Sequence, residues 1–240
     1  AQQRVVYTIN DGWKFTKGSP FEAQLNNCDD SSWETVNIPH TWNDKDADDE
    51  TPGFYRGPAW YRRQLFVDKS QEGRQAVIYF EGANQEVQLY LNGQFVGEHK
   101  GGYTRFCFDI TSKLRYGQEN LFAICVNNTY NPNIPPLSAD FTFFGGIYRD
   151  VNLLVVSKNH FELDYYGMSG MQITPEVKGD AADINMESYV YLEEGADASA
   201  YTVELSILDH EGQVVFKEEA ALSDFTFDQP RFGAITDENW

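Results

Sequence analysis

Apolar and polar residues alternate in short runs along most of the chain, and helical periodicity is nearly absent. In residues 103–110 the side chains of Phe106, Phe108 and Ile110 share one face, the period-two pattern of a strand with one buried side. The Asn-Gly pair at 92–93 separates two such runs and predicts a type I′ hairpin, because both residues tolerate a positive φ. Short strands joined by long irregular loops predict an antiparallel sandwich of jelly-roll type.

The pattern predicts ten strands in the first part of the chain, at 4–9, 13–16, 33–36, 61–67, 76–81, 86–91, 94–98, 103–110, 120–127 and 152–156. After Ser157 it predicts further strands at 161–166, 171–177, 184–192, 201–208 and 213–218. Seven such strands would make an immunoglobulin-like sandwich, and only five or six are visible before Trp240. The expected fold is therefore all-β, with a jelly-roll sandwich over residues 1–157 and a truncated immunoglobulin-like sandwich over 158–240.

The distribution of charge indicates the same boundary. Residues 1–157 carry 14 basic and 19 acidic side chains, a net of −5, whereas residues 158–240 carry 4 and 18, a net of −14. The total of −19 argues against a nucleic-acid partner, because phosphates select basic surfaces. No run approaches the ~20 apolar residues that a membrane helix needs, so no membrane span is expected.

Three cysteines and the first residues bear on the compartment. Cys107 and Cys125 lie within apolar alternation, so buried free thiols are expected; one disulfide with one thiol left over is the alternative. The opening Ala1-Gln2-Gln3 is similar to a mature N-terminus from which a signal peptide has been removed. This similarity predicts an exported protein, periplasmic or extracellular.

Four motifs occur in order: Ile-Pro-His-Thr-Trp-Asn at 38–43, Arg-Gly-Pro-Ala-Trp-Tyr-Arg-Arg at 56–63, Val-Gln-Leu-Tyr-Leu-Asn-Gly at 87–93, and Gly-Gly-Ile-Tyr-Arg-Asp-Val at 145–151. Together they resemble the N-terminal sugar-binding domain of glycoside hydrolase family 2, which includes β-galactosidases, β-glucuronidases and β-mannosidases. The resemblance implies an immunoglobulin-like domain next and then a (β/α)₈ barrel that carries two catalytic glutamates. No βα alternation occurs here, so the chain is expected to be non-catalytic by itself and to support a barrel that it lacks.

The resemblance also implies two substrate-binding residues. In family members with galactosidase activity, an acid shortly before the Gly-Ile-aromatic-Arg motif binds sugar hydroxyls, and Asp140 occupies that position, which favours a β-galactoside. A carboxylate can accept two charge-assisted hydrogen bonds from hydroxyl groups. Arg56 falls in a loop that approaches the substrate in relatives, where it would hold a hydroxyl pair or the Asp140 carboxylate. The alternatives are a solvated or turn-capping acid at Asp140 and a structural ion-pair arginine at Arg56.

Two tryptophans and one further arginine also lie in these motifs. Trp42 and Trp60 are substrate-binding candidates because an exposed indole can stack on a pyranose ring; packing in the core is the alternative. Arg149 is expected to make an internal ion pair on a largely buried strand, because buried charges need partners.

The acidic run 44–50 has the oxygen groups that Ca²⁺ prefers but lacks the EF-hand spacing, so a solvated loop is the simpler interpretation. No zinc spacing, phosphate loop or Ser/His/Asp arrangement occurs, and neither a metal nor a cofactor is expected. The expected partner is a carbohydrate, bound jointly with a catalytic domain, and a homo-oligomeric parent enzyme is compatible with this interpretation. Two rival hypotheses are a stand-alone carbohydrate-binding module and a structural or adhesive β-sandwich protein.

Overall fold

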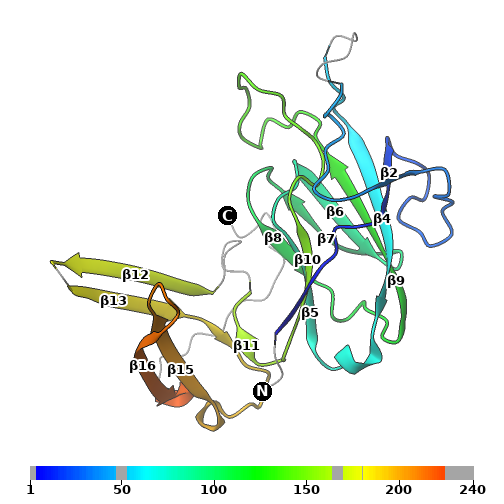
Figure 1. Cartoon of the computed structure of the whole chain (residues 1–240). Helices are drawn as coiled ribbons and strands as arrows, with labels where there is room; N and C mark the ends of the chain where they lie inside the picture. The colour runs from blue at the N-terminus through cyan, green and yellow to red at the C-terminus, as the bar shows by residue number, and fades with distance from the viewer. Residues whose placement is uncertain (1–3, 47–52, 164–169, 180, 225–240) are drawn as a thin grey trace. The chain divides into compact units, whose positions relative to one another are not determined.

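The computed structural model describes residues 4–46, 53–163, 170–179 and 181–224. These residues form sixteen strands and three short 3₁₀ helices, all the ladders are antiparallel, and the expected all-β class is confirmed (Figure 1). In this described part, no helix has the length and apolar character needed to cross a membrane. The chain divides after Ser157 into two compact units.

The first unit consists of two sheets (Figure 1). The four-stranded sheet has the order β1 (Val5–Thr8), β10 (Val151–Val156), β5 (Gln75–Phe80) and β8 (Phe106–Asp109). The six-stranded sheet has the order β3 (Glu34–Val36), β2 (Trp13–Lys17), β4 (Pro58–Val67), β9 (Gln118–Asn127), β6 (Glu86–Leu91) and β7 (Gln94–Lys100). The 3₁₀ helix η1 (Lys69–Gln71) follows β4. Apart from the consecutive pairs β2–β3 and β6–β7, neighbouring strands in each sheet are distant in sequence, as expected of a jelly-roll sandwich.

The main core of this unit lies between the two sheets. On β6 the alternation directs Val87, Leu89 and Leu91 inward, and all three are fully buried. Phe108 of β8 reaches Gly97 of β7, where a Cβ atom would lie 2.8 Å from its ring, so the sheets meet closely at that point. Each fully buried aliphatic side chain contributes about 2 kcal/mol from the removal of apolar surface from water. Burial of the apolar side chains that alternate along the strands is therefore the main source of stability of this unit.

A long loop covers part of the outer face of the six-stranded sheet. Arg62 of β4 is 2% exposed and points to that outer face, opposite to Tyr61 in the main core. Its guanidinium donates to the Asp30 carboxylate at 2.7 Å and to the carbonyl oxygen of Leu25 at 2.8 Å. A small apolar cluster of Ala23, Trp60 and Ala123 forms beside it.

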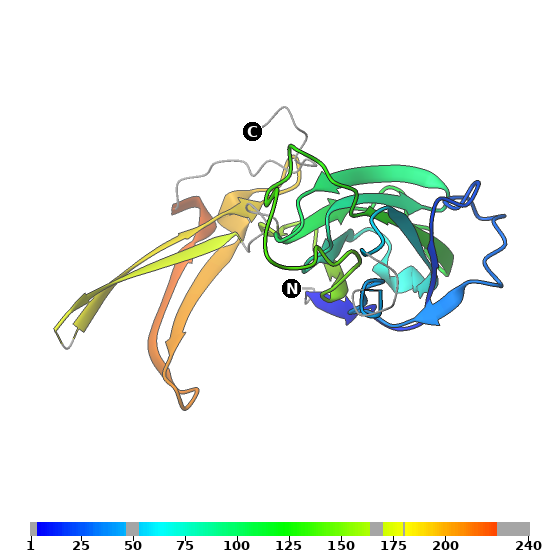
Figure 2. The ribbon, with the colours of Figure 1, turned by 90° about the horizontal axis from the view of Figure 1, so that it is seen from above.

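The second unit consists of three antiparallel pairs (Figure 2, yellow and orange ribbons). They are β11 (His160–Phe161) with β14 (Val190–Tyr191), β12 (Met171–Lys178) with β13 (Ala181–Ser188), and β15 (Thr202–Leu208) with β16 (Val214–Ala221). The 3₁₀ helices η2 (Ala198–Ala200) and η3 (Leu222–Asp224) flank the last pair. The single strand expected at 184–192 is wrong, because pairing changes partner at Tyr189, from β12 to β11. Part of the strand expected at 161–166 lies outside the described residues.

The β12–β13 pair has one apolar and one polar face. Its register places Ile173 opposite Met186 and Val177 opposite Ala182, whereas the other face pairs Glu176 with Asp183. Ile173 is 58% and Val177 75% exposed, so the apolar face is open in the described part of this unit. The alternation was visible in the sequence, but the exposure of the apolar face was not.

Two further expectations can be compared with the structure. Arg149 lies exposed in a bend before β10, with its guanidinium 5.7 Å from the ring centre of Tyr148, so the expected internal ion pair on a buried strand is wrong. The strand begins only at Val151, and the two residues before it, Arg149 and Asp150, are exposed. Cys28, Cys107 and Cys125 form no disulfide, as expected, but all three are half-buried rather than buried.

Candidate functional site

The loops at one end of the first unit bring the candidate residues together. Pro58 at the start of β4 pairs with Asn127 at the end of β9, so the residues before β4 and after β9 leave the sheet side by side. The segment 140–145 packs against both loops, because Phe143 contacts the Arg56 guanidinium with its ring and accepts a hydrogen bond from Asn128 with its carbonyl oxygen. We call residues 54–57, 128–130 and 140–145 the loop edge.

Arg56 is held within this loop edge by a backbone carbonyl and by aromatic rings. Its Nε donates to the carbonyl oxygen of Asn128 at 3.0 Å. Its guanidinium carbon lies 5.3, 5.8 and 6.0 Å from the ring centres of Phe143, Phe54 and Tyr130. Cation–π contacts are worth roughly 0.5–2 kcal/mol each, and they fix the position of the guanidinium without neutralising its charge. No carboxylate in the described part of the chain pairs with Arg56, so the ion-pair alternative is not what the structure shows.

Asp140 is exposed at the other side of the loop edge. Within the described residues its carboxylate has no hydrogen-bond or ion-pair partner, so it neither caps a turn nor binds Arg56. The adjacent Phe141 is 54% exposed and packs against Phe143, whose ring centre lies 5.3 Å away. Phe143 therefore contacts both the Arg56 guanidinium and the ring of Phe141, the residue next to Asp140.

The two tryptophans have a different position from the one that stacking on a sugar requires. Trp42 is 3% exposed and lies in the main core, with its ring stacked 6.2 Å from that of Phe15. Trp60 is 7% exposed and packs against Tyr90 on the outer face of the six-stranded sheet. Neither indole offers a free ring face, so their role is corrected to packing. Residue type alone did not show which face each side chain takes.

The buried Tyr61 and the half-buried His40 form a pair next to Gly146. The Tyr61 hydroxyl is 2.7 Å from His40 Nδ1, and the His40 amide donates to the carbonyl oxygen of Ile147. Burial lowers the pKa of His40, and burial also raises the pKa of Tyr61, so both groups are neutral at pH 7. The pair braces the Gly145–Ile147 segment from below, and neither group is poised to exchange a proton with a ligand.

The described part of the acidic run 44–50 has a structural role. Asp46 accepts hydrogen bonds from Asn43 Nδ2 at 3.0 Å and from the Tyr55 amide at 2.9 Å, and it lies 3.9 Å from Lys17. Residues 47–50 lie outside the described residues, so the expected solvated loop stays a prediction and the calcium alternative stays open. Among the described residues no group of three His, Cys, Asp or Glu side chains is placed to hold a metal ion.

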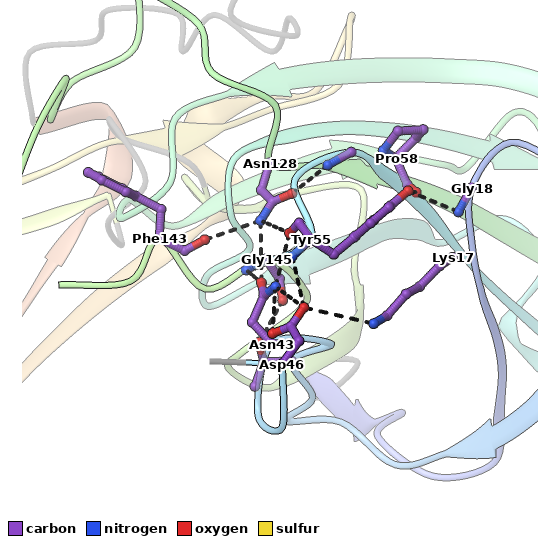
Figure 3. A network of polar contacts seen from close by, with 11 residues as sticks. Lys17, Gly18, Asn43, Asp46, Tyr55, Pro58, Asn128, Phe143 and Gly145 are labelled. Atoms are coloured by element: carbon purple, nitrogen blue, oxygen red, sulfur yellow. Dashed lines mark hydrogen bonds and ion pairs between the residues drawn. The ribbon is translucent and has the colours of Figure 1, made fainter. Parts of the chain in front are cut away.

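Sequence reasoning missed two residues of this site, Asn43 and Asn128. Both are fully buried, and their side chains link the segments of the loop edge (Figure 3). Polar residues after a strand are normally read as turn residues, which is why neither was selected. The available signal was position: Asn43 ends the first motif, and Asn128 directly follows the apolar strand that ends at Asn127.

Comparison with known proteins identifies the family. The model of the sugar binding domain of glycosyl hydrolases family 2 matches residues 8–157. The chain therefore belongs to glycosyl hydrolase family 2.

Similar proteins extend the match into the second unit. A putative beta-glucuronidase of Formosa agariphila is 34% identical over 214 residues, which cover 88% of this chain and 24% of that protein. A beta-galactosidase of Thermoanaerobacter pseudethanolicus is 37% identical over 172 residues, covering 70% of this chain and 23% of that protein. The structure of Bacteroides uniformis beta-glucuronidase matches with a TM-score of 0.80 and 36% identity over 91% of this chain and 26% of that one. The chain thus spans about a quarter of the length of the relatives it matches.

Proposed function

We propose that this chain is the non-catalytic, sugar-binding part of a family 2 glycosidase. In this proposal it supports a (β/α)₈ barrel that supplies the catalytic glutamates, and it lends Asp140 and Arg56 to the sugar pocket. The observation that carries the proposal is the loop edge of a family 2 sugar binding domain, which contains an exposed carboxylate without a partner at Asp140 and a held guanidinium without a carboxylate partner at Arg56. A carboxylate accepts charge-assisted hydrogen bonds from sugar hydroxyls, and a guanidinium donates them to hydroxyls or carboxylates.

The proposed substrate is a β-glycoside of the galactoside or glucuronide type. Asp140 favours a galactoside through the family resemblance, and the relatives include proteins named beta-galactosidase and beta-glucuronidase. Export to the periplasm or the outside of the cell stays a prediction. Homo-oligomerisation of the parent enzyme is part of the same proposal.

The test is the activity of the full-length family 2 enzyme that carries this chain, measured on aryl β-galactoside and β-glucuronide. Asp140→Asn is expected to raise KM by roughly 10- to 100-fold, the equivalent of about 1.5–3 kcal/mol for a hydrogen bond to a charged group. Asp11→Asn, at an exposed acid in the turn before β2, serves as the control and should leave KM unchanged. An unchanged KM in Asp140→Asn would remove Asp140 from the sugar pocket.

A stand-alone carbohydrate-binding module remains a second candidate because several aromatic rings of the loop edge are exposed: Tyr130 by 54%, Phe141 by 54% and Phe144 by 42%. Titration of this 240-residue chain with galactose, lactose, glucuronate and mannose, followed by tryptophan fluorescence, separates the two candidates. Saturable millimolar binding that is lost in Asp140→Asn would favour the module. Absence of binding would favour a half-site that is completed by the barrel.

A further inference from the structure

Asn128 joins two loops that each carry a candidate sugar-binding residue. Its Oδ1 accepts from the Gly57 amide at 2.9 Å, and its Nδ2 donates to the carbonyl oxygens of Phe143 at 3.1 Å and Tyr55 at 3.3 Å. Its own carbonyl oxygen accepts from Arg56. The residues on both sides of Arg56 are therefore fixed to the loop that contains Asp140 through one buried amide group.

Asn43 completes the connection from the other side (Figure 3). Its Oδ1 accepts from the Gly145 amide at 2.7 Å and from Asn128 Nδ2 at 3.3 Å. Its Nδ2 donates to the Tyr55 carbonyl oxygen at 2.9 Å and to the Asp46 carboxylate. The two side chains thus form a single network in which every amide group has a partner, as a buried polar group requires.

The loop reaches this network only because residue 145 is a glycine. A Cβ atom at Gly145 would lie 2.1 Å from Cζ2 of Trp42 and 2.7 Å from Nδ2 of Asn128. The Gly145 carbonyl oxygen also accepts from the Thr41 hydroxyl at 2.8 Å. Both the amide and the carbonyl oxygen of Gly145 are therefore hydrogen-bonded, which fixes the backbone of this loop five residues after Asp140.

We propose that Asn43 and Asn128 form a positioning pair that sets Arg56 and the Asp140 loop relative to each other. This inference rests on the proposed function of Asp140 and Arg56. Neither asparagine contacts the sugar in this proposal, since both are fully buried. Binding groups need placement to within about 0.5 Å, and the pair supplies it across segments that are 85 residues apart in sequence.

The chain offers a matched control near the start of β9, the strand that Asn128 directly follows. Asn120 of β9 is also fully buried, and its side chain bonds the amide and the carbonyl oxygen of Arg115, each at 2.8 Å. It lies eight residues from Asn128, or about 26 Å along the strand direction. Asn120→Ala therefore removes an equally buried amide far from the loop edge.

The first measurement is amide hydrogen exchange by NMR on the 240-residue chain, at Gly57 and Gly145. Asn43→Ala removes the direct acceptor of Gly145 only, and Asn128→Ala that of Gly57 only. A positioning pair predicts that each variant accelerates the exchange of both amides at least tenfold, whereas Asn120→Ala leaves both within twofold. If each variant affects only the amide that it bonds directly, the two asparagines act separately and the inference is overturned. Asn128→Ser provides the same comparison if Asn128→Ala does not fold.

The second measurement is the kinetics of the full-length enzyme that carries the chain. Asn128→Ala is expected to raise KM about tenfold with kcat within threefold, whereas Asn120→Ala, even with a similar loss of melting temperature, leaves KM within twofold. If Asp140→Asn raises KM but Asn128→Ala does not exceed the Asn120→Ala control, the positioning inference fails and the proposed function stands. If the wild-type enzyme hydrolyses no glycoside, the proposed function fails, and the exchange experiment alone decides whether the pair couples the two loops.

Discussion

The Arg62 guanidinium donates to the Asp30 carboxylate at 2.7 Å and thereby fastens the loop before β3 to the outer face of the six-stranded sheet. Arg62 is almost fully buried and also bonds the backbone carbonyl oxygens of Leu25 and Cys28. A planar, five-donor group can serve all of these partners at once, and a lysine ammonium cannot.

Arg62→Lys is therefore expected to lower the free energy of unfolding by about 3 kcal/mol, because it leaves buried acceptors without donors. Urea denaturation followed by circular dichroism measures the change. Arg105→Lys is the control, since the Arg105–Glu81 pair is exposed and such pairs contribute roughly 0–1 kcal/mol. Equal effects of the two substitutions would contradict the role given to Arg62.

Gly145→Ala is expected to destabilise the chain by about 3 kcal/mol or to displace the Asp140 loop. The new Cβ atom would meet the buried Trp42 ring, which is confined by the core and cannot move aside. Thermal unfolding measures the loss. Gly212→Ala, in a turn with φ +80° and nothing within 4 Å, is expected to cost only about 1 kcal/mol from backbone strain.

The stability of the chain is expected to fall as the pH drops below neutrality, partly because of His99. Its ring stacks on that of Phe106 with the centres 3.9 Å apart, and burial lowers its pKa to about 4. The unfolded state binds a proton near pH 6.5, so between pH 6.5 and about 4 it holds more protons than the folded state and the free energy of unfolding decreases. The penalty is absent above pH 6.5 and levels off below about 4.

Urea midpoints at pH 7 and pH 5 test this dependence. His99→Gln should show a smaller loss of stability between the two values than the wild type, because glutamine does not titrate. His210→Gln, at a side chain that is 89% exposed, should retain the wild-type loss. A His99→Gln variant with the full wild-type loss would assign the effect to other groups.

Cys125 is expected to resist alkylation in the folded chain. Burial raises its pKa to about 12, with a further contribution from Glu86, so the reactive thiolate is scarce at pH 8. Iodoacetamide labelling followed by peptide mass spectrometry should leave Cys125 unmodified without denaturant and fully modified in urea. Rapid labelling of the folded chain would show that the sheet opens locally around Cys125 of β9.

Strand positions were largely predictable because they depend on local alternation. The hairpin of β6 and β7 around Asn92-Gly93 was located correctly, since the turn residues and both flanking patterns agree. The change of partner at Tyr189 was not predictable, because it depends on which distant strand lies alongside rather than on the residues themselves.

The sequence predicted only those residues of the candidate site whose charged side chains are recognisable from their place in a motif. Asp140 and Arg56 were selected from motif position, and the structure places both at the loop edge. The asparagine pair was missed because its importance comes from burial and from partners up to 102 residues away, which no local pattern records. Trp42 was misassigned for the same reason, since its motif does not reveal that the ring points into the core.

Trp42 also gives the loop edge a built-in optical reporter. Its indole occupies the space where a side chain at residue 145 would lie, so a shift of that backbone changes the surroundings of the ring even though no ligand touches it. Trp13, which is fully buried and donates from its indole nitrogen to the Ile9 carbonyl oxygen, contributes a steadier background emission. A fluorescence change on adding sugar that disappears in Trp42→Phe would therefore record movement of the loop rather than contact with the sugar.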